Sequence, residues 1–221
     1  MDIAMIGVGH IGANLAQQLT RAGHQVTLAF SRDERRLHEL AEQLGPRAQV
    51  ASPAVAVSQA EVMVLAVPWG QIDLALSQME EVRGKIVLDA TNPFSQGLVD
   101  LGGMSSLAYN QRRLPGASVA KVFNTLTAGF QAEVAAGAHR PIAMFYSASD
   151  ALAHRVCHEL IAAMGFVPVA LDGPAETLME APRRAGAVYG EGYHPSDAET
   201  IAQTAKQDLV QAARLADTLK Q

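Results

Sequence analysis

The sequence predicts an α/β protein with a doubly wound, mainly parallel sheet that carries helices on both faces. The chain opens with an apolar run over residues 2–6, and Gly7-Val8-Gly9-His10-Ile11-Gly12 follows directly. Apolar residues then recur at helical spacing until Gly23, and a second apolar run covers residues 25–30. Strand, G-x-G-x-x-G, helix and strand is the order of a dinucleotide-binding Rossmann fold. We therefore expect this stretch to bind a dinucleotide.

The three glycines of the motif have separate physical roles. Gly7 permits a tight turn, Gly9 lets a pyrophosphate approach the backbone, and Gly12 lets the helix pack closely on the sheet. The first N–H groups of the helix have no partner within it, and the helix dipole favours an anion there. The alternative is a glycine-rich turn that only packs the helix against the sheet.

Composition excludes several classes of function. The chain has 221 residues, of which 49% are hydrophobic and 18% charged, and its net charge of −5 argues against nucleic-acid and acidic-membrane partners. The single cysteine, Cys157, allows no internal disulfide and suits a reducing compartment. No apolar run approaches the ~18 residues of a membrane span, and the chain enters a strand without an apolar leader. We expect a cytoplasmic protein whose partner is a small molecule.

The end of the second strand predicts which nucleotide binds. Enzymes that use NAD usually place an acid there, on the ribose 2′-OH. Here Ser31 and Arg32 follow the strand and Arg36 comes soon after, and hydroxyl and guanidinium groups suit a 2′-phosphate. We therefore predict NADP rather than NAD. Ser31 also fits a capping box with Glu34, which would place Asp33 inside the helix, and both roles can coexist.

Alternating apolar runs and helical patterns continue along the chain. Residues 1–125 are assigned to the NADP-binding domain and residues 126–221 to a smaller α/β lobe, either separate or continuous with the first domain. We predict a loop over residues 95–115, a helix over 149–164, a helical stretch over 173–185 and a last helix of more than twenty residues from Ser196. Further strands are predicted at residues 48–51, 61–67, 85–88, 118–123, 141–147 and 166–171.

Polar and turn-forming residues follow the fourth and fifth predicted strands, at the edge where such folds bind ligands. Val67, Pro68 and Trp69 should line the cofactor crevice, although Trp69 could equally pack on the next helix. Thr91 and Asn92 can hydrogen-bond the nicotinamide carboxamide or a ribose, and local turn chemistry is their alternative role.

Four further residues have a pattern that suggests chemistry. Asn124 ends the sixth predicted strand and is a pocket candidate. Lys121 lies near it, as in some β-hydroxyacid dehydrogenases, but there the pair lies on a helix after a second glycine motif that this chain lacks. His154 and His158 are four apart, which suits a metal, but no third ligand is evident and we predict no metal site.

The C-terminal part offers two weaker signals. Residues 186–195 hold three glycines and two tyrosines, so they form either a mobile flap or an ordinary surface loop. Ser196 and Glu199 fit a capping box for the long last helix. The apolar stripe of that helix could close the core or pair with a second copy, and we predict a homodimer.

The assembled motifs resemble one known family, the coenzyme F420-dependent NADP oxidoreductases. The likeness rests on GVGHIGANLAQQLTRAGHQVTLAFSR, AVPWGQI, LDATNPF and KVFNTL, and on FYSASD with ALAHRVCHELIAAMGFVPVALDG further on. It implies a Rossmann fold with a smaller C-terminal lobe, a dimer, and hydride transfer between NADPH and a deazaflavin. Residues 179–182 and the tyrosine-rich loop depart from the family's deazaflavin lobe, so the acceptor stays open. The NADP contacts that the resemblance implies are Gly7, Gly9, His10, Ile11, Gly12, Ser31, Arg32, Arg36, Val67 and Pro68.

These observations predict an NADPH-dependent oxidoreductase with a ring acceptor, either coenzyme F420 or a flavin. Hydride transfer between two ring cofactors needs no strong acid or base, only rings held face to face, and we assign no catalytic residue. The acceptor would stack among Trp69, Asn92 and Asn124, with Tyr189 or Tyr193 closing the pocket. Two alternatives are a reductase of a small carbonyl or imine, similar to pyrroline-carboxylate reductase relatives, and a sensor that binds NADP without turnover.

Overall fold

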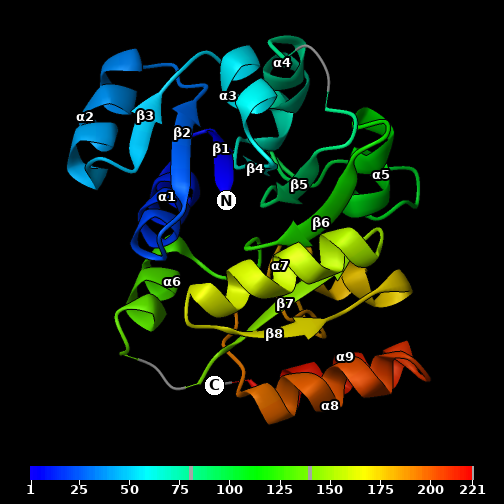
Figure 1. Ribbon diagram of the computed structural model, residues 1–221. Coiled ribbons are helices and arrows are strands. Elements are labelled where there is room, and N and C mark those ends of the chain that lie inside the picture. Colours follow the sequence, from blue (N-terminus) through cyan, green and yellow to red (C-terminus); the bar gives the residue numbers. More distant parts are fainter. Residues whose placement is uncertain (80–81, 139–140, 221) are drawn as a thin grey trace.

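The computed structural model describes residues 1–79, 82–138 and 141–220. Its strands form one eight-stranded sheet in the order β3-β2-β1-β4-β5-β6-β7-β8 (Figure 1). Neighbouring strands are parallel except for β6 and β7, which run antiparallel. The strands are β1 Asp2–Ile6, β2 Gln25–Ala29, β3 Ala48–Val50, β4 Val62–Leu65, β5 Ile86–Asp89, β6 Ser118–Val122, β7 Ala143–Ala148 and β8 Val167–Ala170.

Helices cover both faces of this sheet. Side chains from α1, α2, α6 and α7 pack with one set of strand residues, and those from α3, α4 and α5 pack with the set that points the other way. The described helices are α1 His10–Arg21, α2 Glu34–Leu44, α3 Pro53–Gln59, α4 Ile72–Ser77, α5 Ser106–Arg113, α6 Ala128–Ala135, α7 Ala151–Ala163, α8 Pro195–Ala205 and α9 Leu209–Leu219, with 3₁₀ turns η1 Trp69–Gln71 and η2 Gly173–Met179.

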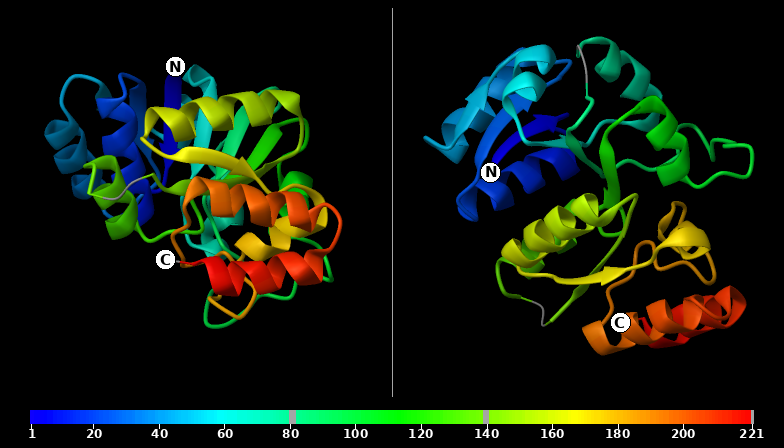
Figure 2. Two further views of the ribbon diagram at one scale, coloured as in Figure 1. Left: turned by 90° about the horizontal axis from the view of Figure 1, so that it is seen from below. Right: turned by 45° about the vertical axis from the view of Figure 1, so that its right-hand side comes forward.

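The predicted doubly wound, mainly parallel α/β fold is confirmed, and each predicted strand is present within two residues at either end. The central strands are almost wholly buried, because helices lie over both of their faces. Strands β7 and β8 lie between α7 and the α8–α9 pair (Figures 1 and 2). Since β6 pairs with β7, one sheet runs through residue 125, and a domain boundary at that point stays a prediction.

Three helix predictions were wrong in informative ways. The long last helix is two helices, because Asp208 caps a new one by accepting from the Gln211 N–H at 2.9 Å. The first of these two begins after His194 and not at Ser196. The predicted loop over residues 95–115 contains a helix, α5, whose start is capped by Ser105. The predicted helical stretch over 173–185 is a 3₁₀ helix, η2, that ends at Met179.

The start of α2 also differs from the prediction. Asp33 is the N-cap and its carboxylate accepts from the Arg35 N–H at 3.1 Å, so the capping box of Ser31 with Glu34 does not form. The Ser31 hydroxyl instead accepts from the Asp33 N–H at 3.1 Å. None of the helices in the described part of the chain is both long and apolar enough to cross a membrane.

Substituting Gly12 with alanine tests the packing that places α1. An added Cβ would lie 2.0 Å from the Gly7 carbonyl oxygen, so backbone must move, and we expect Gly12→Ala to lower the free energy of unfolding by about 3 kcal/mol. Urea unfolding followed by circular dichroism measures this change. Gly9→Ala is the control, because a Cβ there meets nothing within 4 Å, and the unfolding midpoint should fall much less, by no more than the weaker N-cap preference of alanine. Equal midpoints for both variants would contradict this account.

Candidate functional site

The turn that leaves β1 has the geometry that the glycine motif requires. Gly7 has a φ of +98°, and a Cβ on it would meet the Ala66 carbonyl oxygen at 2.6 Å. A Cβ on Gly12 would clash with the Gly7 carbonyl, whereas the space beside Gly9 is open. The fold therefore requires two of the glycines, and the third leaves room for a group from outside.

The N-terminus of α1 points its free amides into this space. Gly9 is the N-cap in extended conformation and no side chain caps the helix. The first bond within the helix runs from the Ala13 N–H to the Gly9 carbonyl at 2.9 Å. No acceptor among the described residues engages the N–H groups of His10, Ile11 and Gly12. With the helix dipole added, these amides make a site for an anion.

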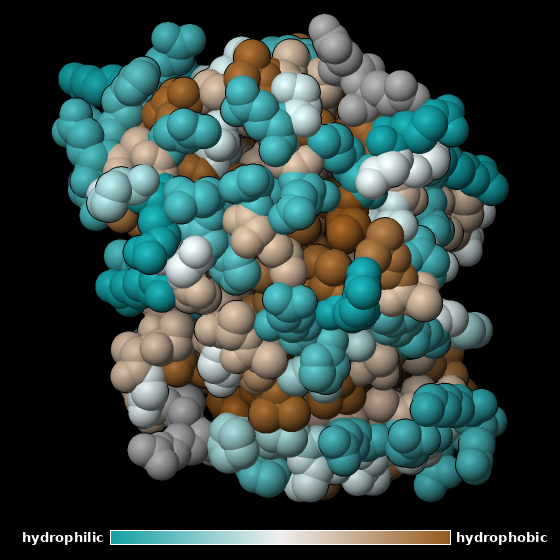
Figure 3. Space-filling view, viewed as in Figure 1, coloured by the Kyte–Doolittle hydropathy of each residue, from teal (hydrophilic) through white to brown (hydrophobic). Residues whose placement is uncertain are grey.

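A groove begins where β2 ends. Phe30 has a φ of +62°, which is uncommon for a residue with a side chain, and the chain turns sharply there. A cavity of about 590 Å³ follows, lined by Ser31 and Arg32 on one side and Pro53 and Leu74 on the other. Hydrophilic side chains gather over α2, at the upper left of Figure 3. Arg32 and Arg36 are exposed there, and within the described residues neither guanidinium has an ion pair or hydrogen bond.

The residues after β4 approach the glycine turn from its other side. Val67 is buried, and its Cγ1 lies 2.8 Å from the place of a Cβ on Gly7. Pro68 is exposed. Trp69 is buried beneath α5, with the Arg113 guanidinium 5.2 Å from its ring centroid and the Tyr109 ring 5.9 Å away. Trp69 therefore packs on α5 and not on the helix that follows it, and its place in the cofactor crevice stays a prediction.

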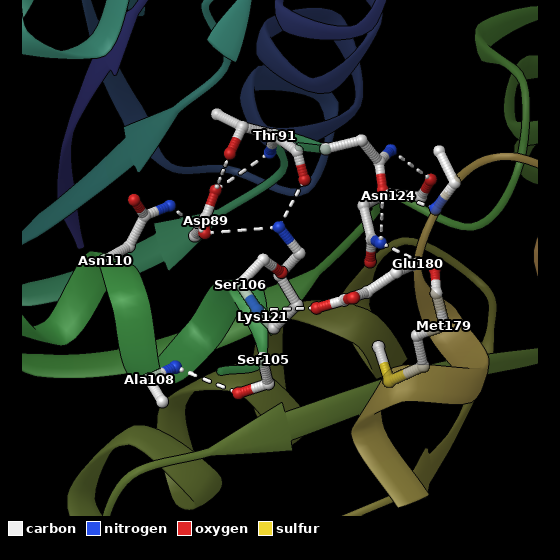
Figure 4. A network of polar contacts seen from close by, with 12 residues as sticks. Asp89, Thr91, Ser105, Ser106, Ala108, Asn110, Lys121, Asn124, Met179 and Glu180 are labelled. Atoms are coloured by element: carbon white, nitrogen blue, oxygen red, sulfur yellow. Dashed lines mark hydrogen bonds and ion pairs between the residues drawn. The ribbon is translucent and has the colours of Figure 1, made fainter. Parts of the chain in front are cut away.

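A buried polar network joins the carboxyl ends of β5 and β6 (Figure 4). One oxygen of Asp89 accepts from the Thr91 N–H at 2.8 Å and from the Thr91 hydroxyl at 2.7 Å. The other accepts from the Asn110 amide at 2.7 Å and from the Lys121 ammonium at 3.2 Å. The same ammonium donates to the Thr91 carbonyl. The network therefore includes Lys121, whose role the sequence analysis left open, and two residues that the sequence analysis did not name.

Asn92 and Asn124 tie the next segment to the sheet. The Asn92 amide donates to the Asn124 carbonyl at 3.1 Å, and its oxygen accepts from the Asn124 amide at 3.1 Å and the Ala181 N–H at 3.2 Å. Asn124 also donates to the Met179 carbonyl at 2.9 Å. The side-chain oxygen of Asn124 is buried without a partner. Residues 179–181, which we call the strap, thus lie across both strand ends (Figure 4).

Two carboxylates of this region face the start of α5. Glu180 accepts from the Ser106 N–H at 2.5 Å, which holds the strap to that helix. Glu176 accepts from the Ser147 hydroxyl at 3.0 Å. Burial raises the pKa of Glu176, and the neighbouring carboxylates of Glu180 and Asp172 add to the rise, while hydroxyl donors oppose it.

One of the two tyrosines that we expected to close the acceptor pocket lies elsewhere, and the role of Tyr189 stays a prediction. Tyr193 is buried in the C-terminal core and donates to the Ala216 carbonyl at 2.7 Å, so its predicted stacking on an acceptor is wrong. The Gly190 N–H donates to Thr125, which packs the loop against the sheet. His154 pairs with Asp172 at 3.3 Å. Within the described residues, no group of three metal-binding side chains comes together.

Sequence reasoning missed Asp89, Asn110 and Glu180. A signal existed for Asp89, because a charged residue at the end of an otherwise apolar strand demands buried partners. Asn110 and Glu180 gave none, since their partners lie 21 and 74 residues away along the chain.

The eight-stranded sheet and the glycine turn with its uncapped helix define a Rossmann-type fold of the dinucleotide-binding class. The family model described as NADP oxidoreductase, coenzyme F420-dependent, matches residues 2–93, and the chain belongs to this family.

Three proteins illustrate the likeness. The structure of the hypothetical protein SMa0349 from Sinorhizobium meliloti has 31% identity and a TM-score of 0.77, over 87% of this chain and 94% of that one. The structure of a candidate F420-dependent NADP reductase from Arthrobacter sp. FB24 has 28% identity and a TM-score of 0.66, over 78% and 85%. The rat metalloreductase STEAP3 is 29% identical over 168 residues, which are 76% of this chain. The chain spans about a third (33%) of the length of that curated relative.

The raised pKa of Glu176 predicts a pH-dependent stability. A carboxyl group whose pKa is higher in the folded state contributes stability at low pH, and that contribution is lost as the pH rises through the folded pKa. Glu176→Gln removes the charge and keeps an oxygen that can accept from Ser147. We therefore expect this variant to melt at a higher temperature than the wild type at pH 8, and at nearly the same temperature at pH 4.

Differential scanning calorimetry at the two pH values measures this. Glu199→Gln, on the exposed surface of α8, is the control and should shift the melting temperature little at either pH. A lower melting temperature for Glu176→Gln at pH 8 would show that the ionised carboxylate stabilises the fold.

Proposed function

We propose that the chain is an NADPH-dependent oxidoreductase that transfers hydride between NADP(H) and a planar ring acceptor, a deazaflavin or a flavin. The observation that carries this proposal is the uncapped N-terminus of α1 beside the open face of Gly9, with unpaired guanidinium groups at the end of β2. The family match supports NADP as the nucleotide. The family's description names coenzyme F420, which supports a deazaflavin as the acceptor.

The residues present fit such a nucleotide at three points. The free amides of His10, Ile11 and Gly12 would hold the diphosphate. Ser31, Arg32 and Arg36 would hold the 2′-phosphate, and the adjoining groove has the volume for an adenosine.

The third point is the buried, unpartnered oxygen of Asn124. A buried acceptor without a donor is costly, and the amide N–H of a carboxamide would satisfy it. Asn124 lies at the end of β6, beside the residues that follow β5. We place the nicotinamide end of the nucleotide there, which keeps Thr91, Asn92 and Asn124 as predicted contacts.

The protein's part in the reaction is to position and to shield. NADPH, when bound, supplies the hydride. The chain's own groups hold the two ends of the nucleotide, and buried side chains such as Trp69 and Thr91 exclude water from the strand ends. Rings held at contact distance need no acid or base from the protein for this transfer.

Arginine substitutions test the choice of nucleotide. We expect Arg32→Ala to raise the Kd for NADPH about 10- to 100-fold and to leave the Kd for NADH unchanged, because only NADPH has the phosphate that a guanidinium binds. Arg35→Ala is the matched control, since this neighbouring arginine is exposed and pairs with Glu39 at 3.5 Å. Fluorescence titration gives both constants. Tighter binding of NADH than NADPH by the wild type would overturn the assignment.

A panel of acceptors tests the reaction. Stopped-flow oxidation of NADPH should be fast with coenzyme F420 or a flavin and slow with quinones, imines and small carbonyl compounds. Gly9→Ala should fold and yet fail to bind NADPH, because its methyl group occupies the diphosphate space. Oxidation by imines or carbonyls alone would identify a small-substrate reductase. Tight NADPH binding without oxidation by any acceptor would identify a sensor.

A further inference from the structure

The ion pair of Lys121 and Asp89 is buried in a place where apolar residues would serve the fold. Lys121 is 1% exposed and Asp89 is 0% exposed. Their neighbours on the same strands and the same face, Val119 and Val87, belong to an apolar core. Replacing a buried ion pair with apolar residues of similar volume is often neutral or stabilising, so stability alone does not explain the pair.

The register of the sheet aims this pair at the turn after β5. Asp89 lies opposite Lys121 in the parallel pairing of β5 and β6, so both side chains are on one face. From there the ammonium reaches forward to the Thr91 carbonyl. Asp89 holds the N–H and hydroxyl of the same residue. Every polar group of Thr91 is thereby fixed by this one ion pair.

The fixed turn leads directly to the predicted nicotinamide contacts. Asn92 is the next residue, and its amide joins Asn124 to Ala181 of the strap. After β1, by contrast, the turn is fixed by the close approach that a missing Cβ allows. The turn after β5 has no glycine, and charge holds it instead.

The indole ring of Trp69 shields the Lys121 ammonium from water. The Lys121 nitrogen lies 6.0 Å from the centre of the indole ring, and the Arg113 guanidinium lies 5.2 Å from the same centre. Trp69 itself is buried. Excluding water strengthens the hold of the ammonium on the Thr91 carbonyl, because interactions between charges and dipoles are weakly screened in such a site.

We propose that Lys121 is a positioning residue: its ammonium fixes the Thr91–Asn92 turn and so holds the nicotinamide end of the nucleotide in the orientation that hydride transfer needs. This inference rests on the proposed use of NADPH. It assigns no contact between Lys121 and the substrate. Removing the ammonium should therefore alter the geometry of transfer more than the affinity for NADPH.

The test uses Asp89→Asn/Lys121→Met, which removes both charges and leaves no buried carboxylate unpaired. Its asparagine oxygen can still accept from the N–H and hydroxyl of Thr91, but its amide nitrogen cannot accept from Asn110, so the variant loses that bond as well as the bond to the Thr91 carbonyl. We expect a folded variant with a lower unfolding midpoint, a Kd for NADPH within about twofold, and a kcat lower by about tenfold or more. Amide hydrogen exchange of residues 90–92 should be faster without any ligand.

A stereochemical measurement separates positioning from general damage. With NADPH deuterated on one or the other face of C4, the wild type should transfer from one face, and the variant should lose that selectivity. Lys85→Met is the matched control. Its ammonium also holds backbone carbonyls, those of Ser58 at 3.1 Å and Ala60 at 2.7 Å, but at the start of β5. This control should keep wild-type kcat and selectivity.

Several outcomes would overturn the inference. The inference fails if the double variant keeps the wild-type kcat and the wild-type amide exchange of residues 90–92. A rise in Kd at constant kcat would overturn it as well, and so would an equal loss of kcat in Lys85→Met. If none of the acceptors tested oxidises NADPH with the wild type, the proposed function fails. The exchange measurement then still tests whether Lys121 fixes the turn.

Discussion

The close contact between helix α1 and the turn after β1 is the constraint on which the rest of the site depends. An added Cβ on Gly12 would be 2.0 Å from the Gly7 carbonyl, so only glycine lets the helix come this near. That approach places the free amides of α1 at the edge of the sheet where the parallel strands β1 to β6 all end. One steric condition thus brings an anion site beside the polar residues at the ends of β5 and β6.

The strand ends along this edge are held by three different physical means. The turn after β1 uses glycine, with Gly7 at a φ of +98°. The ends of β2 and β6 use strained phenylalanines, Phe30 at +62° and Phe123 at +60°, each followed directly by a predicted contact residue. The turn after β5 uses the buried charges of Asp89 and Lys121. In each case the surrounding structure fixes the backbone geometry at this edge. A different kind of substitution would disturb each turn: an added Cβ after β1, a changed residue at a positive φ after β2 and β6, and a lost charge after β5.

The sequence was sufficient where structure is local. The glycine motif and the apolar strands depend on residues a few positions apart, and both were predicted. Helices α5 and α6 were missed, because α5 is mostly polar and α6 has no apolar stripe. The break between α8 and α9 was missed because the apolar spacing continues across Asp208. The joining of Asn92 to the strap spans 89 residues, and no local pattern encodes it.

The wall around the predicted acceptor comes from a different part of the chain than the nucleotide site. The family match ends at residue 93, and the free amides and the arginines lie within it. The strap reaches the same strand ends through η2. Asp172, just before η2, accepts from the Ala148 N–H at the end of β7, and Met179 at its end accepts from Asn124. The part that binds the nucleotide can therefore be shared by proteins whose second substrates differ. If the nicotinamide lies where we propose, the lengths and side chains of η2 and the strap set how much room is left beside it for a ring or a smaller molecule.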